Sequence, residues 1–332
     1  MRLKQKSLLL ILLIPILFSC FEKDKKVLPY PGEVSTISDN IEKYESYFDF
    51  ETGNVIKTHL ADAWQLGFEC GTDGWHILVN SGAQWLIYNT EQTQIDSISN
   101  PPLSASWKYD IQKDYPFSTA VGDWLVKEGS LTTYTKNVYV LGKYSGNNYT
   151  NLIQLVFFEV NDSMYRFFYH DSANGYSDTI NIVKSDSVNF VFYSFTDKHQ
   201  LNLEPDKSKY DIIFCPYYDL ATEFGVTIPY LVRGVLLNVS KTKALLDSTD
   251  AYNQIHFESL LGQDFTNQRD KIGYLWKSVN VNTSSGTAEY TIKINYSYVL
   301  HTAQGNYFKM HFLSYMLNGS SGYPQFEYLQ LK

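Results

Sequence analysis

Histidine and cysteine are the residue types in this 332-residue chain whose side chains most readily hold a metal ion or take part in catalysis. The seven histidines are scattered without the spacing of a metal-binding motif, and the three cysteines form neither a CxxC pair nor a CxxH pair. A histidine without motif spacing is more often a hydrogen-bonded structural residue than a ligand. The sequence therefore predicts no metal site belonging to the protein itself.

Catalytic motifs are also missing from the sequence. No GxSxG, HExxH, GxGxxG or P-loop pattern occurs, so a nucleophile elbow, a zinc-peptidase site and a phosphate cradle lack their signatures. A glycosidase needs only two carboxylates at a suitable separation, which a sequence does not reveal. Asp73, Asp123, Asp211 and Asp219 stand near aromatic residues, but acids beside turns usually stabilise the turn. We therefore expect a binding protein and no enzyme.

Aromatic side chains are the second group that could bind a ligand. The chain has 6 Trp, 27 Tyr and 20 Phe, and Trp and Tyr offer a flat apolar face with a polar tip, which suits a glycan. The candidates for such a surface are Trp75, Trp124, Tyr274 and Trp276. The competing interpretation places them in the cores and rims of β-sheets, since large aromatic residues are highly buried on average.

The charge balance narrows the choice of partner. The chain has 27 basic and 35 acidic residues, a net charge of −8, whereas a nucleic-acid protein needs a basic surface. The apolar content of 44% is enough to build a core, and the length suits about two domains. We expect a folded protein with no nucleic-acid partner.

The N-terminal segment predicts an export signal. Basic residues at positions 2, 4 and 6 precede an apolar run from Leu8 to Phe18, which is too short to span a membrane as a helix. The run ends in LFSC at 17–20, which resembles the lipobox of bacterial lipoproteins. Residues 1–19 are then the signal peptide, Cys20 the membrane-anchoring lipidated residue, and 20–40 a flexible tether. The alternative is an ordinary secretory peptide that ends at a cysteine.

The remaining sequence has the pattern of strands. Tyr290, Ile292, Ile294, Tyr296 and Tyr298 alternate with polar residues, and Asn-Gly or Ser-Gly turn signals separate such runs. Only 251–261 has a short helical pattern. The expected fold class is all-β, with antiparallel sheets throughout.

The sequence also indicates a tandem duplication. YFDF at 47–50 precedes Cys70, and FYSF at 192–195 precedes Cys215 at the same interval. Further matched blocks follow in the same order, at 121–124 with 272–276 and at 139–141 with 298–300. We predict two β domains, 41–180 and 187–332.

Three aromatic segments carry a family resemblance. They are YFDFETG at 47–53 with WQLGF at 64–68, YDIIF at 210–214, and NYFKMHFLSY at 306–315 with GYPQFEY at 322–328. They resemble strands of the HmuY-like haemophore lipoproteins of Gram-negative bacteria. The resemblance implies an all-β fold, a lipid anchor in the outer membrane at the cell surface, and haem captured for delivery to a TonB-dependent receptor.

The resemblance also implies axial ligands for the haem iron. The segment 273–279 is similar to the strand that precedes one family ligand, and His256 lies near the segment that would hold the other. On position alone, His256 and His301 are the candidate haem ligands. Two other interpretations stay open, a glycan-binding surface lipoprotein and a structural or adhesion lipoprotein without a small ligand.

Overall fold

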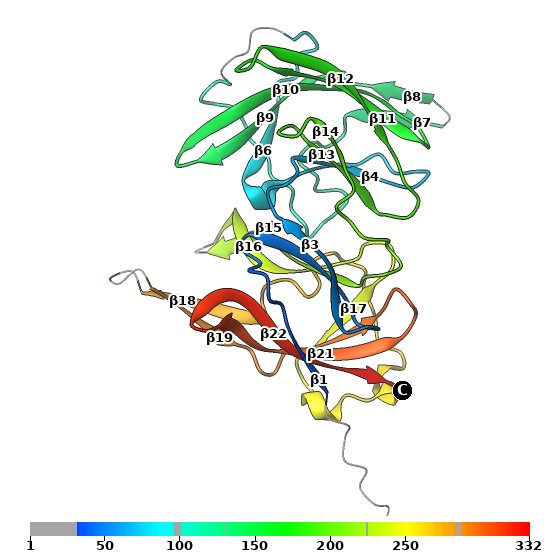
Figure 1. Ribbon diagram of the computed structural model, residues 1–332, viewed down its shortest axis with the longest axis vertical. Coiled ribbons are helices and arrows are strands. Elements are labelled where there is room, and N and C mark those ends of the chain that lie inside the picture. Colours follow the sequence, from blue (N-terminus) through cyan, green and yellow to red (C-terminus); the bar gives the residue numbers. More distant parts are fainter. Residues whose placement is uncertain (1–31, 96–100, 130, 224, 283, 285–286) are drawn as a thin grey trace, which may run out of the picture. The chain divides into compact units, whose positions relative to one another are not determined.

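The structure is a computed structural model, which describes residues 32–95, 101–129, 131–223, 225–282, 284 and 287–332 (Figure 1). The predicted signal peptide and Cys20 lie outside the described residues. Residues 32–332 cluster as one compact unit. Among the described residues, no helix is long and apolar enough to cross a membrane.

The described chain is built from antiparallel strands and three short 3-10 helices, so the predicted all-β fold class is confirmed. The three helices are η1 (Ser81–Ala83), η2 (Tyr252–Gln254) and η3 (Phe257–Leu260). The strands are β1 (Glu33–Thr36), β2 (Tyr44–Asp49), β3 (Asn54–Leu60), β4 (Leu66–Glu69), β5 (Ile77–Val79), β6 (Trp85–Asn89), β7 (Leu125–Glu128), β8 (Leu131–Tyr134), β9 (Val138–Ser145), β10 (Asn148–Val160), β11 (Met164–Asp171), β12 (Tyr176–Val183), β13 (Phe190–Ser194), β14 (His199–Leu201), β15 (Ile212–Glu223), β16 (Val226–Leu237), β17 (Lys243–Asp247), β18 (Lys277–Asn282), β19 (Thr287–Ile292), β20 (Ser297–His301), β21 (Tyr307–Leu317) and β22 (Ser320–Leu331).

The larger sheets form two sandwiches, each with its own hydrophobic core. The first sandwich packs the sheet β12-β11-β10-β9-β6 on the sheet β14-β13-β4-β5, and its core contains Phe68, Trp124 and Phe167. The second packs β1-β22-β21-β20-β17 on β16-β15-β2-β3, and its core contains Phe214, Trp276 and Phe326. Two hairpins, β7–β8 and β18–β19, complete the described strands.

Strand pairs cross the predicted boundary between domains 41–180 and 187–332. β2 pairs with β15, and β13 pairs with β4, so each sandwich contains strands from both predicted domains. β1 pairs with β22, which places an ordered strand inside the segment 20–40 predicted as a tether. Period-two patterning predicts which face of a strand is buried but does not say which strand it pairs with.

The two sandwiches contain aromatic clusters of matching geometry. The rings of Phe214 and Phe326 lie 5.6 Å apart at 23°, and those of Phe68 and Phe167 lie 5.6 Å apart at 20°. Phe68 therefore corresponds to Phe214, and the next residue, Glu69, corresponds to Cys215. Cys70 and Cys215 match by their spacing in the sequence. In the structure, however, Cys215 occupies the place of Glu69, so Cys70 is displaced by one residue.

The same correspondence holds for the exchanged strands. The rings of Phe48 and Phe326 are 5.1 Å apart at 81°, and those of Tyr193 and Phe167 are 5.5 Å apart at 86°. Phe48 lies on β2 in the second sandwich, and Tyr193 lies on β13 in the first. Each sandwich thus receives its equivalent strand from the other predicted domain.

Candidate functional site

The predicted aromatic surface is only partly at the surface. Trp124 and Trp276 are 1% and 0% exposed, and they lie in the two cores. They present no face to solvent, because each indole packs among the buried residues of its core cluster. Tyr274 is half-buried against a smaller core cluster, and Trp75 is half-buried at the edge of the first core.

The two predicted haem ligands lie around one tyrosine. His301 ends β20, and its ring stacks on Tyr307 at 4.6 Å. His256 is exposed and precedes Phe257, whose ring meets the same Tyr307 edge-on at 5.5 Å. No contact joins the two imidazoles, and within the described residues no group of three or more His, Cys, Asp or Glu could hold a metal ion.

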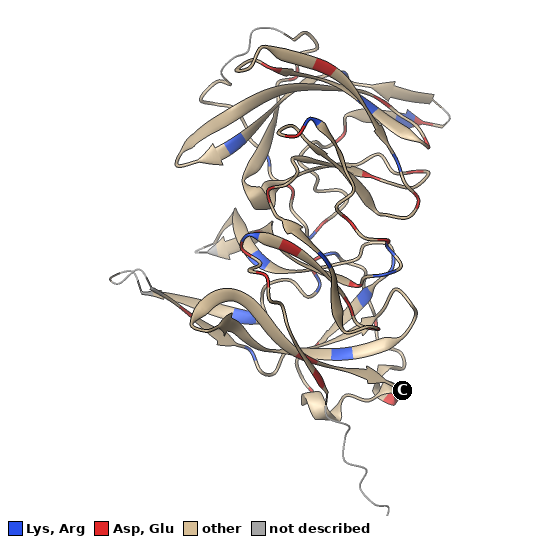
Figure 2. Cartoon of the chain, viewed as in Figure 1, with Lys and Arg blue, Asp and Glu red and all other residues tan. Residues whose placement is uncertain are grey.

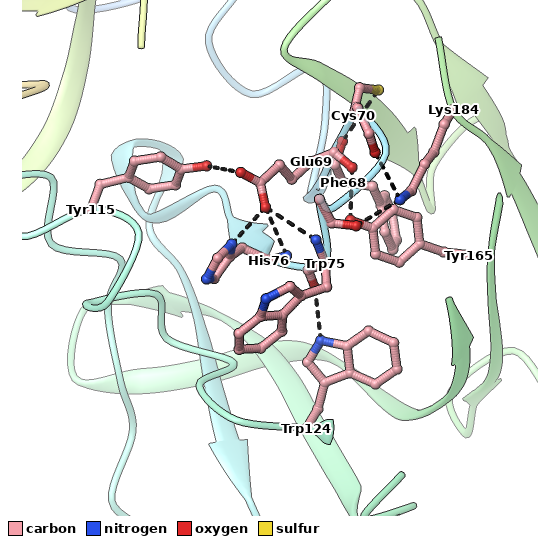
Figure 3. A network of polar contacts seen from close by, with 11 residues as sticks. Phe68, Glu69, Cys70, Trp75, His76, Tyr115, Trp124, Tyr165 and Lys184 are labelled. Atoms are coloured by element: carbon pink, nitrogen blue, oxygen red, sulfur yellow. Dashed lines mark hydrogen bonds and ion pairs between the residues drawn. The ribbon is translucent and has the colours of Figure 1, made fainter. Parts of the chain in front are cut away.

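Glu69 is the centre of a denser polar network, at the end of β4 (Figure 3). The chain turns back after it through residues 70–76 and enters β5. Gly74 is required in this turn, because a Cβ there would lie 2.6 Å from the carbonyl oxygen of Cys70. The tight turn brings His76 back to the carboxylate of Glu69.

Three residues donate hydrogen bonds to the Glu69 carboxylate. The backbone N–H groups of Trp75 and His76 reach Oε2 at 3.1 and 3.2 Å, and the Tyr115 hydroxyl reaches Oε1 at 3.2 Å. The Nδ1 atom of His76 lies 2.5 Å from Oε2. Burial alone would raise the pKa of Glu69, but the contacts from His76 and Trp75 outweigh it and lower that pKa. Glu69 is therefore a carboxylate at neutral pH.

The pairing fixes both the orientation and the tautomer of His76. With Nδ1–H donating to the Glu69 carboxylate, Nε2 is the ring nitrogen left for a ligand, and no described residue forms a hydrogen bond with it. The His76 side chain is 14% exposed, and its ring stacks on Trp75 at 4.1 Å. A carboxylate behind a histidine is the arrangement that prepares imidazole to bind a metal.

The loop that holds this pair is anchored on both sides. The indole N–H of Trp124 donates to the carbonyl of Trp75 at 3.0 Å, which ties the loop to the core. The Lys184 ammonium donates to the carbonyls of Gly71 and Gly74, and it lies 4.9 Å from the ring centre of Tyr165. The histidine is therefore held by a braced loop (Figure 3).

A cleft of about 320 Å³ adjoins the network. Its wall includes Glu69, Tyr115 and Lys207, together with Cys70 and Gln268. This volume is at the lower end of the range for small-molecule sites. Burial raises the pKa of the Cys70 thiol, so the cysteine is no nucleophile at neutral pH.

Sequence patterns alone do not find this site. His76 follows a tryptophan outside any strand pattern, and nothing in the spacing from Glu69 marks the two as partners. Their contact is made by the tight turn at Gly74. The sequence does not show how closely the backbone approaches itself in that turn.

The distribution of charged side chains among the described residues does not indicate a second candidate binding site. In Figure 2 the Lys and Arg residues are scattered singly along the ribbon among acidic residues. Of the four close pairs of basic and acidic side chains found among the described residues, three place a histidine beside a carboxylate, at His59, His76 and His311. Of these, the His76 pair is the shortest.

Comparison with known proteins identifies relatives of the chain. The family model described as HmuY protein matches residues 42–328. No curated protein sequence matches. Among solved structures, a protein named as a lipoprotein from Bacteroides fragilis is 16% identical, with a TM-score of 0.22, covering 55% of this chain and 90% of its own.

Two further solved structures are similar to the chain. An apo HmuY analog from Tannerella forsythia is 11% identical, with a TM-score of 0.21, and the match covers 91% of this chain and 96% of the analog. A protein named as HmuY-like and heme binding, from Bacteroides vulgatus, is 14% identical, with a TM-score of 0.19, covering 53% and 90%. The family model spans most of the chain, so this protein belongs to the HmuY family.

Proposed function

We propose that this protein is a lipoprotein of the outer-membrane surface, anchored through Cys20, that binds haem and passes it to a TonB-dependent receptor. Membership of the HmuY family supports this proposal, as does the heme-binding name of the Bacteroides vulgatus relative. The protein's part is to capture and hand over a ligand without changing it chemically.

The orientation of His76 carries the proposal. Haem in proteins is held by axial side chains such as His, Met, Cys or Tyr. His76 has its Nδ1 atom fixed on Glu69 and its Nε2 atom without a partner among the described residues. Among the described residues, no carboxylate pairs with the ring of His256 or His301. We therefore assign the first axial ligand to His76.

Hemin titration of the chain from residue 22 onward tests the proposal. We expect a shift of the Soret band in the wild type and its loss in His76→Ala. His256→Ala and His301→Ala are the matched controls and should retain the shift. A wild type without a shift in either redox state would exclude haem. If His76→Ala retains the shift while a control loses it, the axial ligand is instead the histidine changed in that control, beside Tyr307.

A further inference from the structure

Five aromatic residues beside the first sandwich and Tyr218 of β15 lie outside the core clusters and form two neighbouring ring groups, which we together call the aromatic platform. The rings of Trp107 and Tyr149 stack at 3.9 Å and 12°, and those of Tyr109 and Tyr218 stack at 4.2 Å and 29°. Tyr144 lies 5.4 Å from Tyr149, and Tyr88 lies 6.1 Å from Trp107. All except Tyr218 are half-buried, so the group is open to solvent in part.

The fold makes room for the platform. A Cβ on Gly142 of β9 would lie 2.9 Å from the Trp107 ring, so only glycine lets the indole settle against the sheet there. The neighbouring residue, Lys108, is held by two backbone hydrogen bonds to Ile87 of β6, at 2.9 and 3.2 Å. The rings are thus fixed before any ligand arrives, which lowers the entropy cost of binding.

Polar groups at the edge of the platform are left without partners. The hydroxyls of Tyr144 and Tyr218 donate to Asn147 and Gln84. No described residue accepts a hydrogen bond from the Trp107 indole N–H, the Tyr88 hydroxyl or the Tyr149 hydroxyl. These three half-buried groups need a ligand or water.

The chemistry of the platform favours one kind of occupant. An apolar peptide would cover these polar groups and leave them unpaired, which is costly. A neutral sugar ring presents an apolar C–H face to an aromatic ring and hydroxyls at its edge, which can pair with such groups. The six residues themselves carry no charge at neutral pH, and burial raises the pKa of Tyr109, Tyr149 and Tyr218. An uncharged ligand fits best.

We propose that the aromatic platform binds a neutral glycan, with a sugar ring stacked beside Trp107 and Tyr149. This site is separate from the Glu69–His76 network and does not depend on haem. It gives the protein a second binding surface for a polysaccharide.

Native gel electrophoresis in gels containing soluble starch, yeast mannan or hydroxyethyl cellulose tests the proposal. We expect at least one of these polymers to retard the wild type. Trp107→Ala and Tyr149→Ala should each weaken binding about tenfold. Tyr230→Ala removes an exposed tyrosine outside the platform and is the matched control, which should be retarded like the wild type.

Three results would overturn the proposal. They are a wild type that none of the three polymers retards, a Trp107→Ala variant with unchanged retardation, and loss of retardation in 0.5 M salt, which would indicate a charged ligand. Tyr149→Phe keeps the ring and removes only the hydroxyl, so weaker binding in that variant separates a lost contact from a folding defect. His76→Ala should bind the polymer normally, which separates this test from that of haem binding.

Discussion

At the scale of single residues, the position of a half-buried carboxylate decides what its neighbours can do. Glu69 accepts hydrogen bonds from Trp75, His76 and Tyr115, and it holds one imidazole in one tautomer. Within the described part of the chain, neither His256 nor His301 of the predicted pair has such a partner. A histidine that the sequence suggests as a haem ligand must therefore be checked for its hydrogen-bond partners, which only the folded structure shows.

Replacing Glu69 tests whether it prepares His76 for haem. Glu69→Gln keeps the size of the side chain and removes its charge, and loss of such a partner typically costs about 10- to 100-fold in metal affinity. We expect hemin affinity to fall within this range while the Soret shift persists at high hemin concentration. Glu159→Gln, near the C-terminal end of β10, is the control. Equal affinities for wild type and Glu69→Gln would contradict the assignment.

Another carboxylate, which is fully buried, makes stability depend on pH. Asp211 accepts hydrogen bonds from the backbone N–H groups of Phe50 and Ala303. Burial raises its pKa from the ordinary value of 3.8 to about 6, so the folded protein holds this proton more tightly than the unfolded chain. Stability from this group is fully present below about pH 4 and is lost as the pH rises to about 6.

Asp211→Asn should remove this pH dependence. In the first sandwich Gln65 occupies the equivalent place, and its side-chain oxygen accepts from the N–H of Phe195. We expect the free energy of unfolding of the wild type, relative to Asp211→Asn, to fall between pH 4 and 6 by at most about 3 kcal/mol. Urea unfolding at pH 4, 5, 6 and 7 measures it. Parallel pH curves for the two proteins would contradict the raised pKa.

At the scale of elements, the alternation of apolar and polar residues predicts the strands but misses where some of them end. Tyr290 and Ile292 lie on β19 and Tyr298 lies on β20, yet the alternation of 289–298 suggests one continuous strand. The chain turns between them, where the N–H of Tyr296 donates to the carbonyl of Lys293, and Ile294 is 83% exposed. Period two continues by chance across a turn, so the pattern cannot show the break.

The expected helix at 251–261 is a related case. The structure has two short 3-10 helices there, η2 and η3, separated by the extended Ile255 and His256. Ile255 is 1% exposed and packs with Val299 of β20. Burial of this side chain against a sheet outweighs the local helical preference.

The close approach of η1 to β15 can be tested by adding one methyl group at Gly82. A Cβ on Gly82 would lie 2.2 Å from the carbonyl oxygen of Pro216, which is backbone and cannot rotate away. We expect Gly82→Ala to lower the free energy of unfolding by about 1–3 kcal/mol. The control is Gly67→Ala, whose Cβ would meet side-chain atoms of Phe192 and Leu78 at 3.2 and 3.3 Å. A loss no larger than that of the control, in urea unfolding, would contradict the contact.

At the scale of the whole molecule, the sequence does not show that β2 pairs within the second sandwich and β13 within the first. Matched blocks predict two similar halves, and the paired aromatic geometry of the two sandwiches supports that duplication, which stays a prediction. Sequence similarity cannot show that β2 and β13 have changed places, because each strand fits either sheet by pattern. Only the pairing partners distinguish the two arrangements.

Cutting the chain between the halves tests the exchange. The connection between β12 and β13 includes the exposed Asp186 and Ser187, so a specific protease site can be inserted there. We expect the two fragments to elute together in gel filtration, because β4–β13, β2–β15 and β1–β22 still join them. They should separate in urea. Fragments that separate in native buffer would show that the halves are independent domains.

The pairing of β1 with β22 also sets the order in which the protein can fold during synthesis. Glu33 lies opposite Tyr328, and their side chains are hydrogen-bonded across 295 positions of sequence. A nascent chain that leaves the ribosome N-terminus first carries β1 without its partner until β22, the last strand, follows, whereas β2 and β3 can pair with each other at once. Long-range pairing of this kind is slow. The sheet β1-β22-β21-β20-β17 of the second sandwich therefore becomes complete only when the last strand has been synthesised, whereas every strand of the first sandwich lies before residue 202 and is available earlier.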